Sequence, residues 1–263
     1  MTNQTRLDTS RANAARVGNV LLGGKDAYDL DLRVAEPLLD SQFAVALVES
    51  RRFARRAVEH LSNEHQVRQV VELGCGFPLP PDIGAIAARA NRAARTLYID
   101  NDLLAVTHAH ALLREPQTFV AKADLTDTAA VLTQITTVMD TTAPLAVCLS
   151  GTAELLADAP VVLESLTREL PPDSWIILSH ITNEPFWHDV GRAVEVLGSA
   201  GIAYHPRDRD TITAMLAPYR LIDPELIEPH RWRPADTIHD ALRSLRPEPW
   251  GLSAYAAVGQ LRA

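Results

Sequence analysis

The sequence predicts an α/β fold in which helices cover both faces of a mostly parallel sheet. Short β-branched runs alternate with helical stretches, the runs are apolar throughout, and most end in a glycine or a polar residue. Alternation of this kind implies parallel βαβ units, and continuous apolar strands are typical of sheets buried on both faces. Two further strands follow the last helical stretch, so we expect a seven-stranded sheet.

The elements follow in order along the chain. The first part is helical over 12–22 and 29–61, with a glycine-rich break at 23–26. We expect strands at 67–73, 95–100, 117–123, 143–150, 174–180, 219–228 and 253–261. Helices are expected at 83–94, 103–113, 128–139, 160–170, 184–199 and 209–216. The chain is thus predicted to form a helical cap over 1–65 and a ligand-binding sheet domain over 66–263.

Composition restricts the class of protein. The 263 residues are 47% hydrophobic, and the formal net charge of −8 argues against broad nucleic-acid binding, which needs a basic surface. Four arginines within 51–56 are predicted to lie on the solvated face of a helix. Two cysteines cannot form a disulfide framework or a paired-cysteine zinc site. The polar N-terminus and the lack of a long apolar run predict a cytoplasmic protein that does not enter a membrane.

Glycines and polar side chains follow the first four predicted strands. The carboxyl ends of parallel strands form the edge at which open α/β sheets bind ligands. Glycines allow a ligand to approach the backbone, and carboxylates can accept hydrogen bonds from ribose hydroxyls or from an adenine amine. The candidate cofactor residues are Glu72, Gly74, Cys75 and Gly76 at the carboxyl end of the first strand, Asp100 and Asn101 at that of the second, Asp124 and Leu125 at that of the third, and Ser150 and Gly151 at that of the fourth.

Several motifs along the chain are shared with one known family. The most specific is Leu-Leu-Gly-Gly-Lys-Asp at 21–26, and others lie at 68–78, 98–102, 178–180, 232–234 and 255–259. With these motifs the chain resembles the bacterial, actinobacterial-type family of S-adenosyl methyltransferases, formerly a domain of unknown function. The resemblance implies a Rossmann-like class I methyltransferase fold and S-adenosylmethionine as ligand. It also implies that Lys25 or Asp26 lies near the ligand; the alternative is a helix C-cap with solvated charges.

The function expected from these features is S-adenosylmethionine-dependent methylation of a small molecule at oxygen, nitrogen or carbon. His180, at the end of the fifth strand, and Tyr28 are candidate catalytic residues. No metal site is expected, because His108 and His110 are two apart and point to different faces of a helix. The oligomeric state is left open, with a homodimer among the alternatives.

Two alternative functions are kept. One is a non-catalytic S-adenosylmethionine-binding protein, because 150–154 differs from the apolar, histidine-containing segment of the family. The other is a nicotinamide-dependent oxidoreductase, for which Asp100 would also suit a ribose. Pro78 stands in place of the third glycine of the dinucleotide motif, and a Tyr-x-x-x-Lys pair is absent, so this second alternative is disfavoured.

Overall fold

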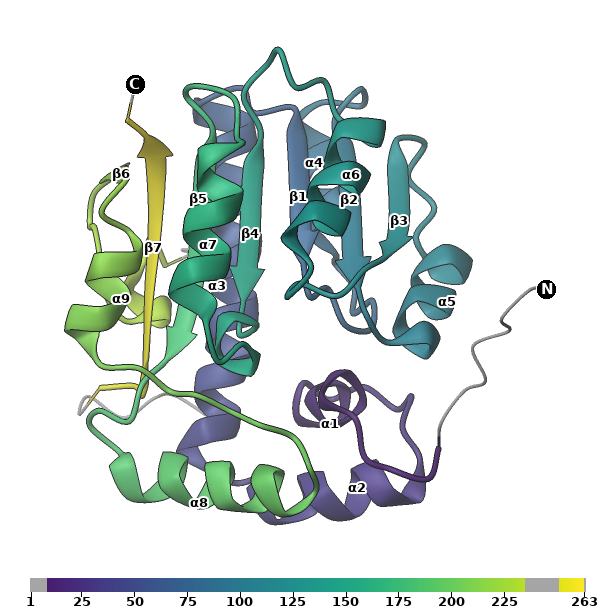
Figure 1. The fold of residues 1–263 in the computed structure, drawn as a ribbon, viewed down its shortest axis with the longest axis vertical. Coiled ribbons are helices and arrows are strands. Elements are labelled where there is room, and N and C mark those ends of the chain that lie inside the picture. Colours follow the sequence, from purple (N-terminus) through teal and green to yellow (C-terminus); the bar gives the residue numbers. More distant parts are fainter. Residues whose placement is uncertain (1–8, 235–250, 263) are drawn as a thin grey trace.

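The protein is a seven-stranded mixed sheet with helices on both faces, as the sequence predicts. The computed structural model describes residues 9–234 and 251–262. Within them the sheet has the order β3-β2-β1-β4-β5-β7-β6, and β7 runs antiparallel to both of its neighbours. Figure 1 shows β1 to β4 ending at the same lower edge. The strands are β1 (Gln69–Leu73), β2 (Arg95–Asp100), β3 (Thr118–Lys122), β4 (Ala146–Ser150), β5 (Trp175–Ile181), β6 (Tyr219–Leu221) and β7 (Ala254–Leu261).

Two apolar clusters sandwich the sheet because successive side chains of a strand point to opposite faces. Val71 and Leu73 join one cluster, together with residues of α6, α7 and α9. Val70 and Cys148 join the other, together with residues of α3 and α4. The helices are α1 (Ala14–Leu21), α2 (Asp29–Ala35), α3 (Gln42–Glu64), α4 (Ile83–Ala90), α5 (Leu103–Leu112), α6 (Thr128–Val138), α7 (Ala159–Arg168), α8 (Trp187–Ser199) and α9 (Arg209–Met215).

The single helix predicted over 29–61 is wrong, because the chain breaks between α2 and α3. Pro37, which has no amide hydrogen to donate, lies in a short 3₁₀ turn, η1 (Glu36–Leu38). Ser41 then caps the start of α3, where its hydroxyl accepts a hydrogen bond from Ala44 N at 3.2 Å. The predicted helix at 184–199 likewise begins later, at Trp187, after Pro185. The strand predicted at 219–228 ends at Leu221.

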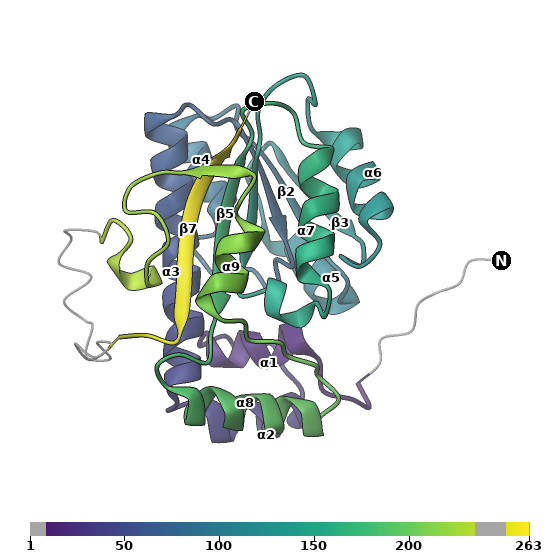
Figure 2. The same cartoon turned by 60° about the vertical axis from the view of Figure 1, so that its left-hand side comes forward.

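A layer of helices covers the carboxyl ends of the strands. Figures 1 and 2 show α1, α2 and α8 beneath this edge of the sheet. Their apolar side chains form one cluster with the first part of α3, including Val17, Phe43 and Leu197. The sequence predicted a cap from the N-terminal residues alone and missed the contribution of α8. We call this layer the helical cap.

Helix α3 connects the helical cap to the sheet. Its first turns contribute Phe43 and Ala46 to the cap cluster, and its later turns contribute Phe53 and Leu61 to the cluster against the sheet. The helix therefore crosses from the predicted cap into the sheet domain before residue 65. In the described part of the chain, no helix has both the length and the apolarity that crossing a membrane requires.

Candidate functional site

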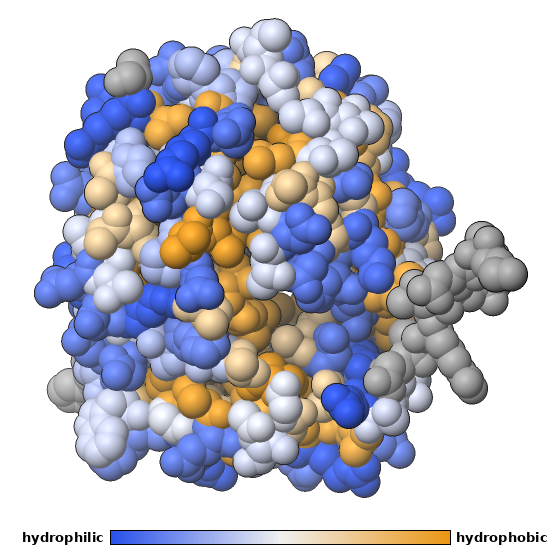
Figure 3. All heavy atoms as spheres, in the orientation of Figure 1, coloured by the Kyte–Doolittle hydropathy of each residue, from blue (hydrophilic) through white to orange (hydrophobic). Residues whose placement is uncertain are grey.

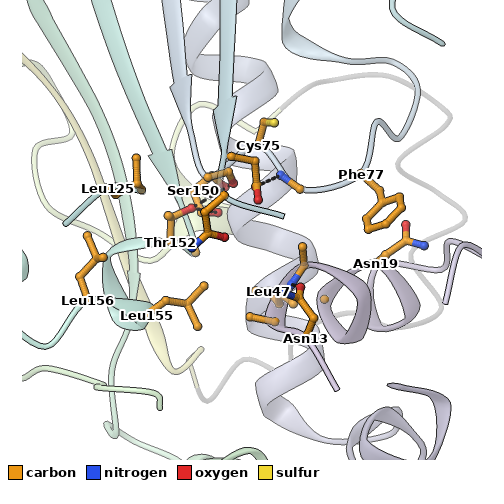
Figure 4. A pocket seen from close by; sticks show the side chains of 18 of the residues that line it. Asn13, Asn19, Leu47, Cys75, Phe77, Leu125, Ser150, Thr152, Leu155 and Leu156 are labelled. Carbon is orange, nitrogen blue, oxygen red and sulfur yellow. Dashed lines mark hydrogen bonds between the residues drawn. The ribbon is translucent and has the colours of Figure 1, made fainter. Parts of the chain in front are cut away.

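A cavity of about 300 Å³ lies between the carboxyl edge of the sheet and the helical cap. Its volume is at the lower end of the range for ligand pockets. Figure 3 shows the surface hollowed between the sheet and the cap, with hydrophobic residues beside the hollow, and Figure 4 shows the lining side chains. Nine of the predicted cofactor residues line the cavity: Gly74, Cys75, Gly76, Asp100, Asn101, Asp124, Leu125, Ser150 and Gly151.

The turn after β1 exposes its backbone to the cavity. Gly74 and Gly76 have φ values of +67° and +60°, a region that glycine adopts readily. A Cβ on Gly74 would lie 2.2 Å from Thr152 Cγ2, so the loop after β4 requires glycine there. A Cβ on Gly76 would meet no atom within 4 Å. Gly76 therefore leaves space at the cavity wall that any other side chain would take.

Asp100 joins the first turn to the second. Its Oδ2 accepts a hydrogen bond from Gly76 N at 2.8 Å, and its Oδ1 accepts one from Asp102 N at 2.9 Å. Burial raises the pKa of Asp100, although the hydrogen bonds from Asp102 and Gly76 oppose that shift. The structure thus holds a buried carboxylate in a fixed orientation at the cavity wall.

Asp124 and Leu125 form the neighbouring wall after β3. Asp124 Oδ1 accepts hydrogen bonds from Thr126 N at 2.9 Å and from Thr126 Oγ1 at 2.8 Å. These bonds lower the pKa of Asp124, and the side chain of Asn101 contributes to the same effect. Leu125 is buried in the cluster against the sheet. This wall therefore pairs an ionised carboxylate with an apolar surface.

Arg51 reaches the cavity from α3 and forms a buried ion pair with Glu72 on β1. Glu72 is 1% exposed, and its second carboxylate oxygen, Oε2, has no hydrogen-bond partner among the described residues. Glu72 itself does not line the cavity, which differs from its predicted place there. The carboxylate instead positions Arg51, whose guanidinium supplies a positive charge at the cavity.

The predicted solvated face of arginines is wrong for most of the run. Arg55 donates to Leu79 O at 2.7 Å, and burial together with the charges of Arg51 and Arg52 lowers its pKa to about 10. Arg56 donates to Trp232 O at 3.1 Å. Arg52 keeps 41% of its side chain exposed, whereas Arg51 keeps 10%. Arg51, Arg55 and Arg56 therefore contact other parts of the fold, because α3 packs beside β1 and beside the segments that carry Leu79 and Trp232.

The segment 21–26 forms the C-terminal end of α1 and holds a cavity-lining residue in position. Gly23 has a φ of +86° and its N–H bonds Val20 O at 2.9 Å. A Cβ on Gly24 would lie 2.0 Å from Asn19 Oδ1, and Asn19 Nδ2 donates to Asp26 O at 3.2 Å. Asn19 lines the cavity, whereas Lys25 and Asp26 do not. The structure therefore favours the capping interpretation, with Asn19 as the residue that the motif positions.

The two candidate catalytic residues lie away from the cavity. His180 is fully buried, and its Nδ1 is 2.7 Å from Ile181 O. Its Nε2 lies 3.0 Å from Arg207 Nη1, which can only donate, so Nε2 accepts and Nδ1–H donates to the carbonyl. Tyr28 is 37% exposed at the start of α2. Neither lines the cavity, so the geometry does not support a catalytic role for either.

The unusual segment 150–154 is folded inward by buried polar contacts. Glu154 is fully buried and accepts a hydrogen bond from Ile181 N at 2.5 Å. Arg207 donates to the carbonyls of Ala153, at 3.1 Å, and Leu156, at 2.7 Å. These contacts fix the loop that brings Thr152, Leu155 and Leu156 to the cavity.

Sequence reasoning missed the lining residues that come from the cap. Asn13, Gly18 and Asn19 belong to α1 or precede it, and no motif links α1 to the strands. For Arg51, a signal did exist: a glutamate within the apolar strand 69–73 requires a buried cation. Among the described residues, no group of three His, Cys, Asp or Glu side chains is arranged to hold a metal ion.

The sheet order, the antiparallel β7 and the glycine turn at the carboxyl edge define a class I methyltransferase fold. The chain belongs to the S-adenosyl methyltransferase family, whose model matches residues 1–262. A search of the curated proteins found no match.

Solved structures resemble the chain over nearly its whole length. A DUF574 family protein from Streptomyces avermitilis is 26% identical with a TM-score of 0.89, covering 98% of this chain and 100% of that one. A proposed methyltransferase from Thermobifida fusca is 24% identical with a TM-score of 0.87, covering 98% and 97%. An S-adenosylmethionine-dependent methyltransferase from Mesorhizobium loti shares only the fold, at 13% identity and a TM-score of 0.54, covering 79% and 97%.

Proposed function

We propose that the cavity binds S-adenosylmethionine and that the protein transfers its methyl group to a small molecule. The observation that carries this proposal is the carboxylate of Asp100, held by Gly76 N at 2.8 Å beside a glycine turn that is open to the cavity. Bound there, S-adenosylmethionine supplies a methyl group made electrophilic by its sulfonium. The remaining work of the protein is to bind, orient and exclude water.

The lining residues fit the three parts of this cofactor. Asp100 would accept hydrogen bonds from the ribose hydroxyls, because its carboxylate oxygens keep free lone pairs. Asp124 would accept one from the adenine amine, with Leu125 against the ring. Arg51, which lines the cavity, would pair with the methionine carboxylate. The family to which the chain belongs implies the same ligand.

Two features support a small-molecule acceptor: the net charge of the protein, and the helical cap that covers the binding edge of the sheet. The net charge of −8 disfavours a polyanionic acceptor, and the helical cap lies across the carboxyl edge of the sheet. With His180 and Tyr28 away from the cavity, alignment of donor and acceptor is the mechanism that the lining residues support. A general base is required only where the acceptor atom must lose a proton.

Calorimetric titration with S-adenosylhomocysteine tests the cofactor assignment, with Asp124→Ala as the test variant and Asp140→Ala as its matched control. Both carboxylates accept hydrogen bonds from the N–H and hydroxyl of a threonine two residues later, but only Asp124 lines the cavity. Asp124→Ala should weaken binding roughly 10- to 150-fold, the loss of one hydrogen bond to a charged group. Asp140→Ala should bind as the wild type does. Equal affinities for the two variants would refute the assignment.

Activity and binding assays on the wild-type protein distinguish the proposed function from its two alternatives. Transfer of radiolabelled methyl groups into the small-molecule fraction of a cell extract is the outcome expected here. Tight binding without any labelled product would favour the non-catalytic alternative, for which 150–154 remains the motivation. Binding of NADH in place of S-adenosylhomocysteine would favour the oxidoreductase.

A further inference from the structure

A second, smaller cavity adjoins the first within the helical cap. Its volume is about 60 Å³. Five residues line both cavities: Ala14, Gly18, Leu47, Gly151 and Leu155. Figure 4 shows Leu47 and Leu155, two of these shared residues. The far wall includes Phe43 from α3, Leu197 from α8, and Ile202 and Tyr204 from the segment that follows α8. We call this space the apolar chamber.

Among the described residues that line the apolar chamber, one has a polar side chain, Tyr204. Every other lining residue is glycine, alanine, valine, leucine, isoleucine or phenylalanine. Tyr204 is 7% exposed, and its hydroxyl has no hydrogen-bond partner among the described residues. Its ring packs edge-on against Phe43, with the ring centroids 5.2 Å apart. A buried hydroxyl without a partner is unfavourable, so a ligand that supplies one gains affinity from it.

The charge state of Tyr204 is fixed by its surroundings. Burial raises its pKa well above the usual value, and the nearby charge of Glu154 acts in the same direction. The hydroxyl is therefore neutral and can donate a hydrogen bond. A charged group placed in the chamber would lose its hydration and meet no opposite charge among the lining residues.

We propose that the apolar chamber binds the end of the methyl acceptor, and that this end is a short, uncharged alkyl group carrying one oxygen or nitrogen that bonds the Tyr204 hydroxyl. The acceptor role rests on the proposed function of the adjoining cavity. The chamber, at about 60 Å³, is much smaller than the roughly 150 Å³ of an apolar cavity that holds benzene, so it takes only the tip of a chain, whose remaining atoms extend past the shared lining residues into the larger cavity. The lining residues shared by the two cavities let one acceptor reach from the chamber to the methyl donor.

Methyl NMR of the full chain tests the proposal with four probes of similar length. Butan-1-ol carries the alkyl chain and the hydroxyl, pentane carries only the chain, and butanoate and butylammonium carry charges. Shifts are followed at the methyl groups of Leu197 and Ile202, which line only the chamber. Titrations are made with and without saturating S-adenosylhomocysteine, whose own binding is measured by calorimetry.

The expected result is that butan-1-ol and pentane shift these methyl groups while the two charged probes do not. Tyr204→Phe should weaken the binding of butan-1-ol roughly 2- to 12-fold, which is the contribution of one neutral hydrogen bond. It should leave the affinity for pentane unchanged. Tyr219→Phe is the matched control, because Tyr219 is a buried tyrosine bonded to Thr167 away from the chamber. It should leave both affinities unchanged.

Two results would overturn the proposal while the cofactor assignment stands. The first is binding of butanoate or butylammonium as tight as that of butan-1-ol. The second is an equal response of butan-1-ol to Tyr204→Phe and Tyr219→Phe. If S-adenosylhomocysteine itself fails to bind, the proposed function fails and the acceptor role falls with it, whereas the probe titrations still decide whether the chamber takes neutral alkyl ligands.

Discussion

Replacing Arg51 with methionine should cost far more stability than removal of an ordinary surface arginine. Glu72 is 1% exposed, and its ion pair with Arg51 is buried. Removing one partner of a buried pair leaves an uncompensated charge and typically costs about 3–5 kcal/mol. Total stabilities are about 5–15 kcal/mol, so Arg51→Met should lose a large fraction of its free energy of unfolding.

The double variant Arg51→Met/Glu72→Leu isolates the cause. With both charges gone, the site holds apolar groups of similar volume, and its stability should return to within about 1 kcal/mol of the wild type or exceed it. Arg168→Met is the surface control, because its pair with Glu164 leaves 68% and 56% of the side chains exposed. Such exposed helical pairs contribute about 0.3–0.5 kcal/mol.

Urea denaturation followed by tryptophan fluorescence measures all four proteins, since Trp175 and Trp232 are buried and report on the core. Calorimetry with S-adenosylhomocysteine then separates folding from binding. Both variants that lack Arg51 should bind roughly 10- to 150-fold more weakly, whatever their stability. A double variant as unstable as Arg51→Met would refute the buried-charge argument, and wild-type affinity in the double variant would refute the role of Arg51 in the cavity.

Three further predictions concern the cavity and the core. Because burial raises the pKa of Asp100, and the charged carboxylate accepts hydrogen bonds from ribose hydroxyls more strongly than the neutral acid does, affinity for S-adenosylhomocysteine should rise with pH up to that raised pKa and then level off; Asp100→Asn should remove this dependence in calorimetry. Gly76→Ala and Gly201→Ala each place a Cβ in open space at positive φ, so each should lower the free energy of unfolding measured in urea by about 1–2 kcal/mol. Only Gly76→Ala should weaken the binding of S-adenosylhomocysteine, and equal affinities of the two variants would exclude Gly76 from the site. Trp232→Ala should destabilise the protein by about 3–5 kcal/mol, because the ring is fully buried against Phe53, whereas a loss under 1 kcal/mol would contradict that packing.

Parts of the fold with strong local signals were predicted correctly from the sequence. Strands such as 95–100 and the β1 turn are recognisable because sheets buried on both faces need continuous apolar runs, and the turn needs glycine. The break before Ser41 was missed although Pro37 was a local signal for it. The apolar pattern simply continues across the break, so periodicity alone predicted one helix.

The residues of the candidate site likewise separate into those that local sequence signals predicted and those that depend on packing between distant segments. Asp100 and Asp124 could be predicted at the cavity because parallel strands bring their carboxyl ends to one edge. The inward turn of Arg51 and the role of α8 could not, because both depend on how α3 and α8 pack against distant segments. His180 lies near the end of its strand, as predicted, but its ring is buried and its Nε2 contacts Arg207 Nη1 at 3.0 Å. That the lining residues bind a cofactor stays a prediction.

The helical cap is assembled from two stretches of chain that lie more than a hundred residues apart in sequence. Val17 and Phe43 of the first stretch share one apolar cluster with Val190 and Leu197 of the second. Deleting the first stretch would therefore turn the inner face of α8 into an exposed apolar patch and promote aggregation instead of yielding a trimmed sheet domain. For the same reason, a chimera that takes its helical cap from another member of the family must import both stretches at once, since each supplies part of a shared apolar cluster.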